Sequence, residues 1–101
     1  GELIKVYATK LRKPSSAAFY KDLVAIAEID GRISVFNKEG KMVAEVGTNN
    51  TKEIGKNIFG PETWEAGIVK APHGIAFDGQ GNILMTEYNK WGRVMKFKVK
   101  P

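Results

Sequence analysis

The chain is 101 residues long with a net charge of +5, from 16 Lys and Arg against 11 Asp and Glu. This length corresponds to one small domain or part of one. The absence of cysteine excludes disulfides and thiolate metal sites. The basic residues are scattered and not interleaved with aromatic ones, so we expect no nucleic-acid partner. No apolar run approaches the roughly 18 residues of a spanning helix, so we expect no membrane partner.

The first elements in chain order are an apolar stretch and a short basic connector. Residues 2–7 alternate with a period close to two, which predicts a strand. Residues 10–13 connect it to Pro14, where a first full unit begins. Within that unit Asp30-Gly31 is a two-residue hairpin signal. The strands expected in the unit are 16–19, 23–29, 32–36 and 41–46.

A second unit begins at Pro72. Its apolar residues alternate on both sides of a turn at 79–81, which predicts two strands joined by a tight reversal, and a third strand precedes the end of the chain. Between the units, residues 49–71 lose all periodicity and form a long loop. The apolar residues of the loop argue against simple disorder. They are Ile54, Ile58, Phe59, Trp64 and Ile68.

The two units repeat one another. Residues 14–19 match 72–77, residues 24–28 match 83–87, and residues 31–36 match 92–97. The first unit continues into a fourth strand at 40–48, and residues 1–9 match that strand nearly position by position. We therefore divide the chain into four parts. These are 1–9, the fourth strand of a shared blade; 14–48, the first blade; 49–71, the loop; and 72–101, the first three strands of the second blade.

Repeated four-stranded antiparallel units with a small-residue first strand and a polar last strand predict an all-β fold, a β-propeller. A sandwich would need no such repeat, and the units of a solenoid are rarely four-stranded. The second unit resembles the NHL repeat through Pro72-His73-Gly74-Ile75-Ala76, Gly81-Asn82-Ile83, Glu87 and Arg93-Val94. The first unit is looser, because Ser16 replaces the glycine and Tyr20 the aspartate.

The resemblance implies a six-bladed ring, which two blades cannot complete by themselves. Three copies supply six blades if each N-terminal strand finishes the last blade of a neighbour, so we expect a homotrimer with strand exchange between the termini. A dimer or tetramer is less favoured. The rival interpretation is a C-terminal excerpt of a longer single-chain propeller, in which residues 1–9 ended an earlier blade.

The candidate site lies on the propeller face that gathers the loop before each first strand and the loop after each second strand. His73, the only histidine, is expected beside the axis, where three copies would meet. The resemblance to amidating-lyase propellers of the NHL type implies histidine metal ligands there, so zinc is the expected metal. Only His73 carries over, since Ser15 stands at the matching position of the first blade. The alternative is a channel histidine bonded to backbone and water.

Five other side chains are candidates for ligand binding. Glu28 and Glu87 either orient His73, or pair with Arg32 and Arg93, or cap a hairpin. The aromatic candidates form a ligand rim or a lid, or they pack against neighbouring structure. These are Tyr88, Trp91 and Trp64.

The leading hypothesis for function is a self-assembling scaffold with a face that binds a metal, a small molecule or a peptide near the axis. The alternative is a metal-dependent lyase or hydrolase that uses water bound to a His73 metal. The third hypothesis is an excerpt without activity of its own.

Overall fold

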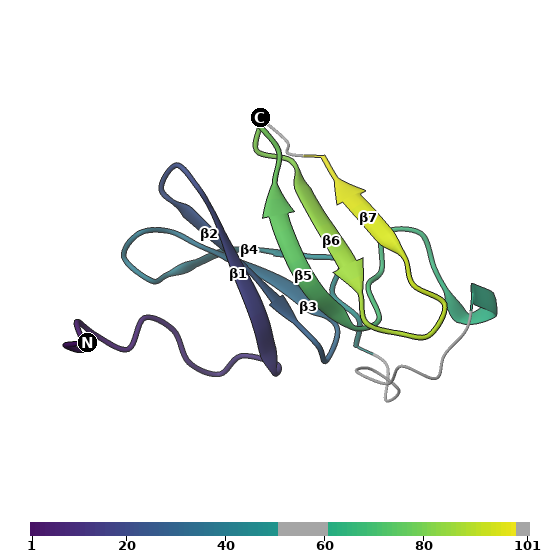
Figure 1. The fold of residues 1–101 in the computed structure, drawn as a ribbon, viewed down its shortest axis with the longest axis horizontal. Helices are drawn as coiled ribbons and strands as arrows, with labels where there is room; N and C mark the ends of the chain where they lie inside the picture. The colour runs from purple at the N-terminus through teal and green to yellow at the C-terminus, as the bar shows by residue number, and fades with distance from the viewer. Residues whose placement is uncertain (51–60, 99–101) are drawn as a thin grey trace.

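The computed structural model describes residues 1–50 and 61–98, and within these ranges it contains seven strands and no α-helix (Figure 1). No helix in the described ranges is long and apolar enough to cross a membrane. A single 3-10 turn, η1, covers Pro61–Thr63. The strands are β1 (Pro14–Tyr20), β2 (Leu23–Glu28), β3 (Arg32–Phe36), β4 (Met42–Val46), β5 (Pro72–Phe77), β6 (Ile83–Glu87) and β7 (Val94–Phe97).

The first sheet is an antiparallel meander in the order β1-β2-β3-β4. Strand β2 reads Leu-Val-Ala-Ile-Ala-Glu. Its first two residues are half-buried and its last four are buried, as expected for a strand covered on both faces. The turn into β3 uses Gly31 at φ 95°, a conformation that glycine adopts without steric cost. Strand β4 is mostly exposed, in keeping with its position at the edge of the sheet.

The second sheet is a shorter meander in the order β5-β6-β7. Its first turn is organised by Asp78, whose carboxylate accepts the backbone N–H groups of Gln80 and Asn82, each at 2.9 Å. The Asn82 side chain donates a further hydrogen bond to Asp78 at 2.9 Å. An Asx turn of this kind fixes the reversal that the sequence predicts.

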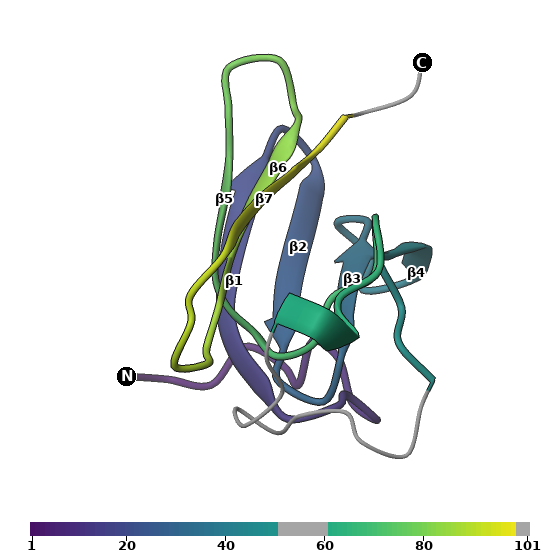
Figure 2. The same ribbon diagram turned by 90° about the vertical axis from the view of Figure 1, so that its right-hand side faces the viewer.

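The hydrophobic core lies between the two sheets, and β1 lies against β5 (Figure 2). From the first sheet it takes Leu23, Ala25, Ile33, Val35 and Val46. From the second sheet it takes Ile75, Phe77, Ile83, Met85, Met95 and Phe97, and Val69 of the connecting segment joins them. Inward-pointing residues are odd-numbered in β2, β3, β5, β6 and β7 because side chains alternate along a strand. In β4 the even-numbered Ala44 and Val46 lie opposite the inward-facing Val35 and Ile33, since the β3–β4 register shifts between Val35 and Phe36.

The all-β fold and the two antiparallel sheets of four and three strands are thus confirmed. The matched units also share a detail that the sequence did not reveal. A β-bulge interrupts β1 between Pro14 and Ser16, and another interrupts β5 between Pro72 and Gly74. Ser15 and His73 are therefore the extra residues of equivalent bulges.

Residues 1–13, all of which the structure describes, form no strand within the single chain, unlike the expectation for residues 2–7. The segment runs outward, away from the second sheet (Figure 1). A strand needs a hydrogen-bonded neighbour, and the sequence expectation places that neighbour in another copy. Of the expected loop anchors, Ile54, Ile58 and Phe59 lie outside the described residues.

Candidate functional site

The predicted site residues lie at one end of the sheets, where β1 and β5 begin and β2 and β6 end. The turn after β6, residues 88–93, adds Tyr88 and Trp91, and the segment before β5 adds Trp64. The structure brings these residues together in three groups. The groups are the Glu28 cluster, formed with Arg32 and Ser34, the Glu87 cluster, formed with Arg93 and Trp64, and the His73–Tyr88 pair. Trp91 belongs to none of the three.

Glu28 ends β2 and is fully buried. Its carboxylate accepts hydrogen bonds from the Arg12 backbone N–H at 2.5 Å, from Arg32 Nη2 at 2.8 Å and from the Ser34 hydroxyl. Burial by itself would raise the pKa of Glu28. The hydrogen bonds and the charge of Arg32 outweigh burial and hold this pKa below its ordinary value.

Glu87 occupies the matching place at the end of β6. Its carboxylate accepts the backbone N–H groups of Lys70 at 3.0 Å and Ala71 at 2.6 Å, and it pairs with Arg93 Nη2 at 2.6 Å. In each unit the glutamate therefore joins two parts of the chain. One is the segment that leads into the sheet, and the other is the arginine at the start of the third strand, Arg32, or just before it, Arg93. Of the roles that the sequence left open, pairing with arginine is the one that the structure shows for both glutamates.

Trp64 packs on the Glu87 cluster. The Arg93 guanidinium lies 4.4 Å from the centroid of the Trp64 ring, a cation–π contact, while its Nη2 also donates to the Ile68 carbonyl at 3.0 Å. Among the described residues, no hydrogen-bond partner lies within reach of the buried Trp64 Nε1 and Arg93 Nε. Trp64 therefore packs the segment before β5 against the second sheet, which matches the packing role better than the role of a lid.

His73 lies at the bulge of β5 and is exposed. Its ring centroid is 5.2 Å from that of Tyr88, with the two rings tilted by 34°. Its backbone carbonyl accepts hydrogen bonds from the hydroxyls of Ser15 and Ser16, each at 2.7 Å. The two matching bulges are thus in direct contact, and the imidazole and phenol rings form an exposed pair beside them.

Trp91 is also exposed, and its ring lies 5.1 Å from Lys90 Nζ. The turn that carries it is held by Asn89, whose side-chain oxygen accepts the backbone N–H groups of Trp91 at 3.1 Å and Gly92 at 2.7 Å. The sequence analysis did not single out Asn89, although asparagine is a common turn residue because its side chain accepts backbone N–H groups two residues on. It also missed Arg12 and Ser34, whose contacts with Glu28 join residues far apart in the chain.

The described residues contain no group of three His, Cys, Asp or Glu side chains that could hold a metal ion. One chain offers His73 alone, which does not fit the three ligands of a catalytic zinc site. A zinc site therefore remains a prediction that depends on three copies meeting at an axis. Metal analysis of purified protein, with His73→Ala as control, tests it.

No protein-family model matches the chain, and no curated protein is similar to it in sequence. The resemblance to the NHL repeat therefore remains a prediction from the residues quoted above.

Proposed function

We propose that this chain is a self-assembling propeller protomer, three copies of which close a six-bladed ring. The observation that supports the proposal is the way in which the two sheets pack. The sheets are repeats of each other, yet the face that the first sheet turns to the core corresponds to the outer face of the second sheet. We call this face-to-back packing. The ring presents His73, Tyr88 and Trp91 as a binding face for a small molecule or a peptide.

The outer face of the first sheet corresponds to the face that the second sheet buries. The buried residues Phe77, Ile83 and Met85 match Phe19, Val24 and Ile26 in the repeat. Strand register places these last three on the side of the first sheet that turns away from the core. Phe19 is 75% exposed in the single chain whereas Ile26 is 9% exposed, so this packing face is left uncovered at its β1 edge.

The converse holds for the outer face of the second sheet. The residues Ala25, Ile33 and Val35, which face the core, match Leu84, Val94 and Lys96. These three share the outer side of the second sheet, and Val94 is 67% exposed. Each copy therefore has the two halves of the same sheet-to-sheet contact, one at either side. A head-to-tail contact of this kind closes into a ring when its rotation permits.

The number of copies follows from the blade count. Propellers have about four to eight blades, which corresponds to two to four copies of a two-bladed chain. The six blades implied by the NHL resemblance select three. In such a ring β1 and β5, which lie side by side in the chain, become the strands nearest the axis, and the bulge that carries His73 recurs three times around it.

The solution mass of the full chain tests the ring. Sedimentation or light scattering should give about three times 11.2 kDa. Phe19→Asp should reduce the mass to that of one chain, since a charge on a face that becomes buried is costly. Ala66→Asp introduces the same side chain at an exposed loop position and should leave the mass unchanged. A monomeric wild-type chain would overturn the proposal.

A further inference from the structure

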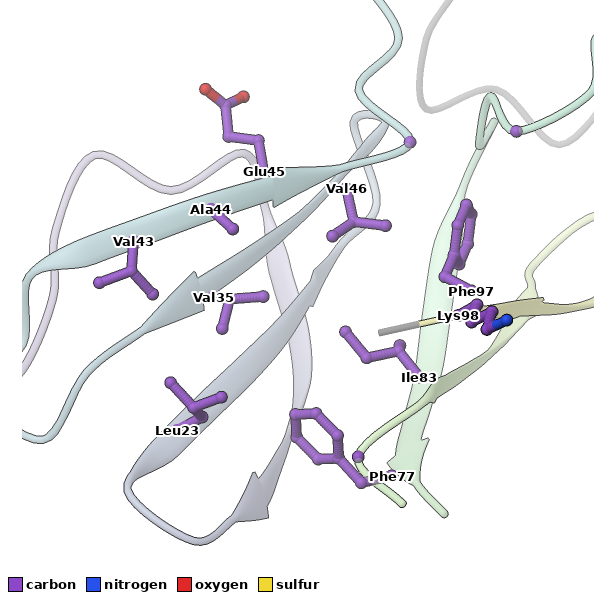
Figure 3. A pocket seen from close by; sticks show the side chains of 13 residues that line it. Leu23, Val35, Val43, Ala44, Glu45, Val46, Phe77, Ile83, Phe97 and Lys98 are labelled. Carbon is purple, nitrogen blue, oxygen red and sulfur yellow. The ribbon is translucent and has the colours of Figure 1, made fainter. Parts of the chain in front are cut away.

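An apolar groove of about 570 Å³ opens between the two sheets on the side of β4 (Figure 3). Val43, Ala44 and Val46 of β4 line one wall, and Phe77, Ile83 and Phe97 line the other. The groove differs from the His73 end in chemical character, because its two walls consist of aliphatic and aromatic side chains. The sequence analysis did not anticipate it.

The groove exists because the two sheets differ by one strand. Strand β4 is the fourth strand of the first sheet, whereas the described part of the second sheet ends at β7. Within that part β7 pairs with β6 alone, so its other edge carries unpaired backbone groups. The inner side of β4 consequently faces an empty position beside β7, and Val43 remains 52% exposed.

We propose that residues 1–9 of a second copy occupy this groove and pair antiparallel with β7 as the fourth strand of the second sheet. This occupant deepens the ring proposed above and requires it. The segment is the sequence equivalent of 40–48, which contains β4. Residues 1–9 are therefore the part of the chain whose residue pattern fits a fourth strand beside β7.

The repeat also fixes the register. In the first sheet Ser34 lies opposite Glu45 and Phe36 opposite Met42. The matching pairs across the copies are Met95 with Val6 and Phe97 with Leu3. Met95 and Phe97 belong to the core face of the second sheet, so Val6 and Leu3 would point into the groove.

The exposure of the segment supports this placement. Leu3 is 76% and Val6 70% exposed in the single chain, although both are aliphatic. Burial of such side chains in an apolar groove is the main favourable term in association. The backbone of the segment would at the same time satisfy the unpaired edge of β7.

The chain's own segment lies on the wrong side of the first sheet to fill its own groove. Tyr7 packs edge-on against Phe36 with ring centroids 6.2 Å apart, and its hydroxyl donates to the Asn37 carbonyl. Phe36 pairs with Val24 on the outer face of that sheet, opposite the groove. The occupant must therefore come from another copy.

The contact between Tyr7 and Phe36 also holds residues 1–9 in a position to pair with a neighbouring copy. Tyr7 and Phe36 match Val46 and Phe97 in the repeat, and Val46 and Phe97 both pack against the core between the two sheets. Residues 1–9 thus lie against the first sheet in the way that β4 lies against the second. A neighbour that covers the outer face of the first sheet would bring its β7 alongside the segment.

Disulfide trapping in the full chain tests the register. Because the chain has no cysteine, Val6→Cys with Met95→Cys introduces the only reactive pair. Directly opposed residues of antiparallel strands have Cα separations that a disulfide can bridge. Mild oxidation should give covalent products of two and three chains on a non-reducing gel. The control, Val6→Cys with Val94→Cys, places the second thiol on the opposite face and should give several-fold less product.

The outcomes separate this inference from the ring itself. A mass of three chains without a 6–95 link, or with equal linking in the control, would overturn the groove as receptor while the ring stands. A monomer-sized oxidised product would show that the chain's own segment fills the groove and would overturn the second copy. A monomeric mass without linking would overturn both the ring and the exchange.

Discussion

Glu28 and Glu87 occupy equivalent positions in the two sheets, and each is buried against the arginine at the start of the third strand, Arg32, or just before it, Arg93. Each also accepts backbone N–H groups from the segment that enters its sheet. The pair is thus a repeated internal clamp that joins the first, second and third strands of each unit. A buried carboxylate with this many donors is costly to disturb, because its partners lose their acceptor together.

We therefore expect Glu28→Gln to destabilise the chain. The substitution keeps the shape but leaves the buried Arg32 charge without its counter-ion, and breaking such a pair costs about 2 to 4 kcal/mol. Urea denaturation of the purified chain measures the free energy of unfolding. Glu39→Gln, at an exposed position of the turn before β4, is the matched control and should stay within about 0.5 kcal/mol of wild type. Equal effects at the two positions would contradict the clamp.

The lowered pKa of the Glu28 carboxylate predicts that the stability of the folded chain decreases at acid pH. The pKa of Glu28 is lower in the folded chain than its ordinary value, so its contribution to stability is present above that value and is lost as pH falls through the folded pKa. Asp78, whose pKa is also lowered chiefly by the Asn82 side chain, acts in the same direction. The melting temperature should therefore fall between about pH 5 and pH 3. Glu28→Gln should show a smaller fall than wild type, and a parallel curve would contradict the assignment.

The sequence predicted most of the fold because its signals are local. The alternation of Ile83 and Met85 and the Asp30-Gly31 turn each act within a few residues, and the structure confirms the strands that they indicate. The candidate site was less predictable. Its contacts join residues far apart in the chain, as with Trp64 over Arg93, so no periodic pattern records them. The groove depends on how two sheets face each other, which a strand pattern does not specify.

Gly81 provides a test of the contact between the two hairpin tips. It has φ +85°, and a Cβ atom there would lie 2.7 Å from Tyr20 Cε2. The Tyr20 ring cannot withdraw freely because it packs on Phe77 at 5.4 Å. Gly81→Ala should cost about 2 to 4 kcal/mol from backbone strain and overpacking. Gly79→Ala, in the same turn but with open space around it, should be nearly neutral in the same thermal or urea melts.

Two neighbouring residues of the N-terminal segment should respond in opposite ways to the same substitution. In the proposed register Val6 points into the apolar groove, whereas Lys5 lies opposite Lys96 on the other face, as Ala44 lies opposite Val35 in the first sheet. Val6→Asp would bury a charge and should reduce the assembled mass to that of one chain. Lys5→Asp replaces a repulsive cross-strand pair with an attractive one and should leave assembly intact or tighten it by about 0.2 to 1 kcal/mol.

Sedimentation over a range of protein concentrations measures both effects, and circular dichroism checks that each variant keeps its sheets. Because Val6 is largely exposed in the single chain, its substitution should not unfold the protomer. Loss of assembly in both variants would mean that the segment contributes through its charge rather than through the groove. Retention in both would mean that residues 1–9 do not enter the contact between copies, and the strand pairing with β7 would be wrong.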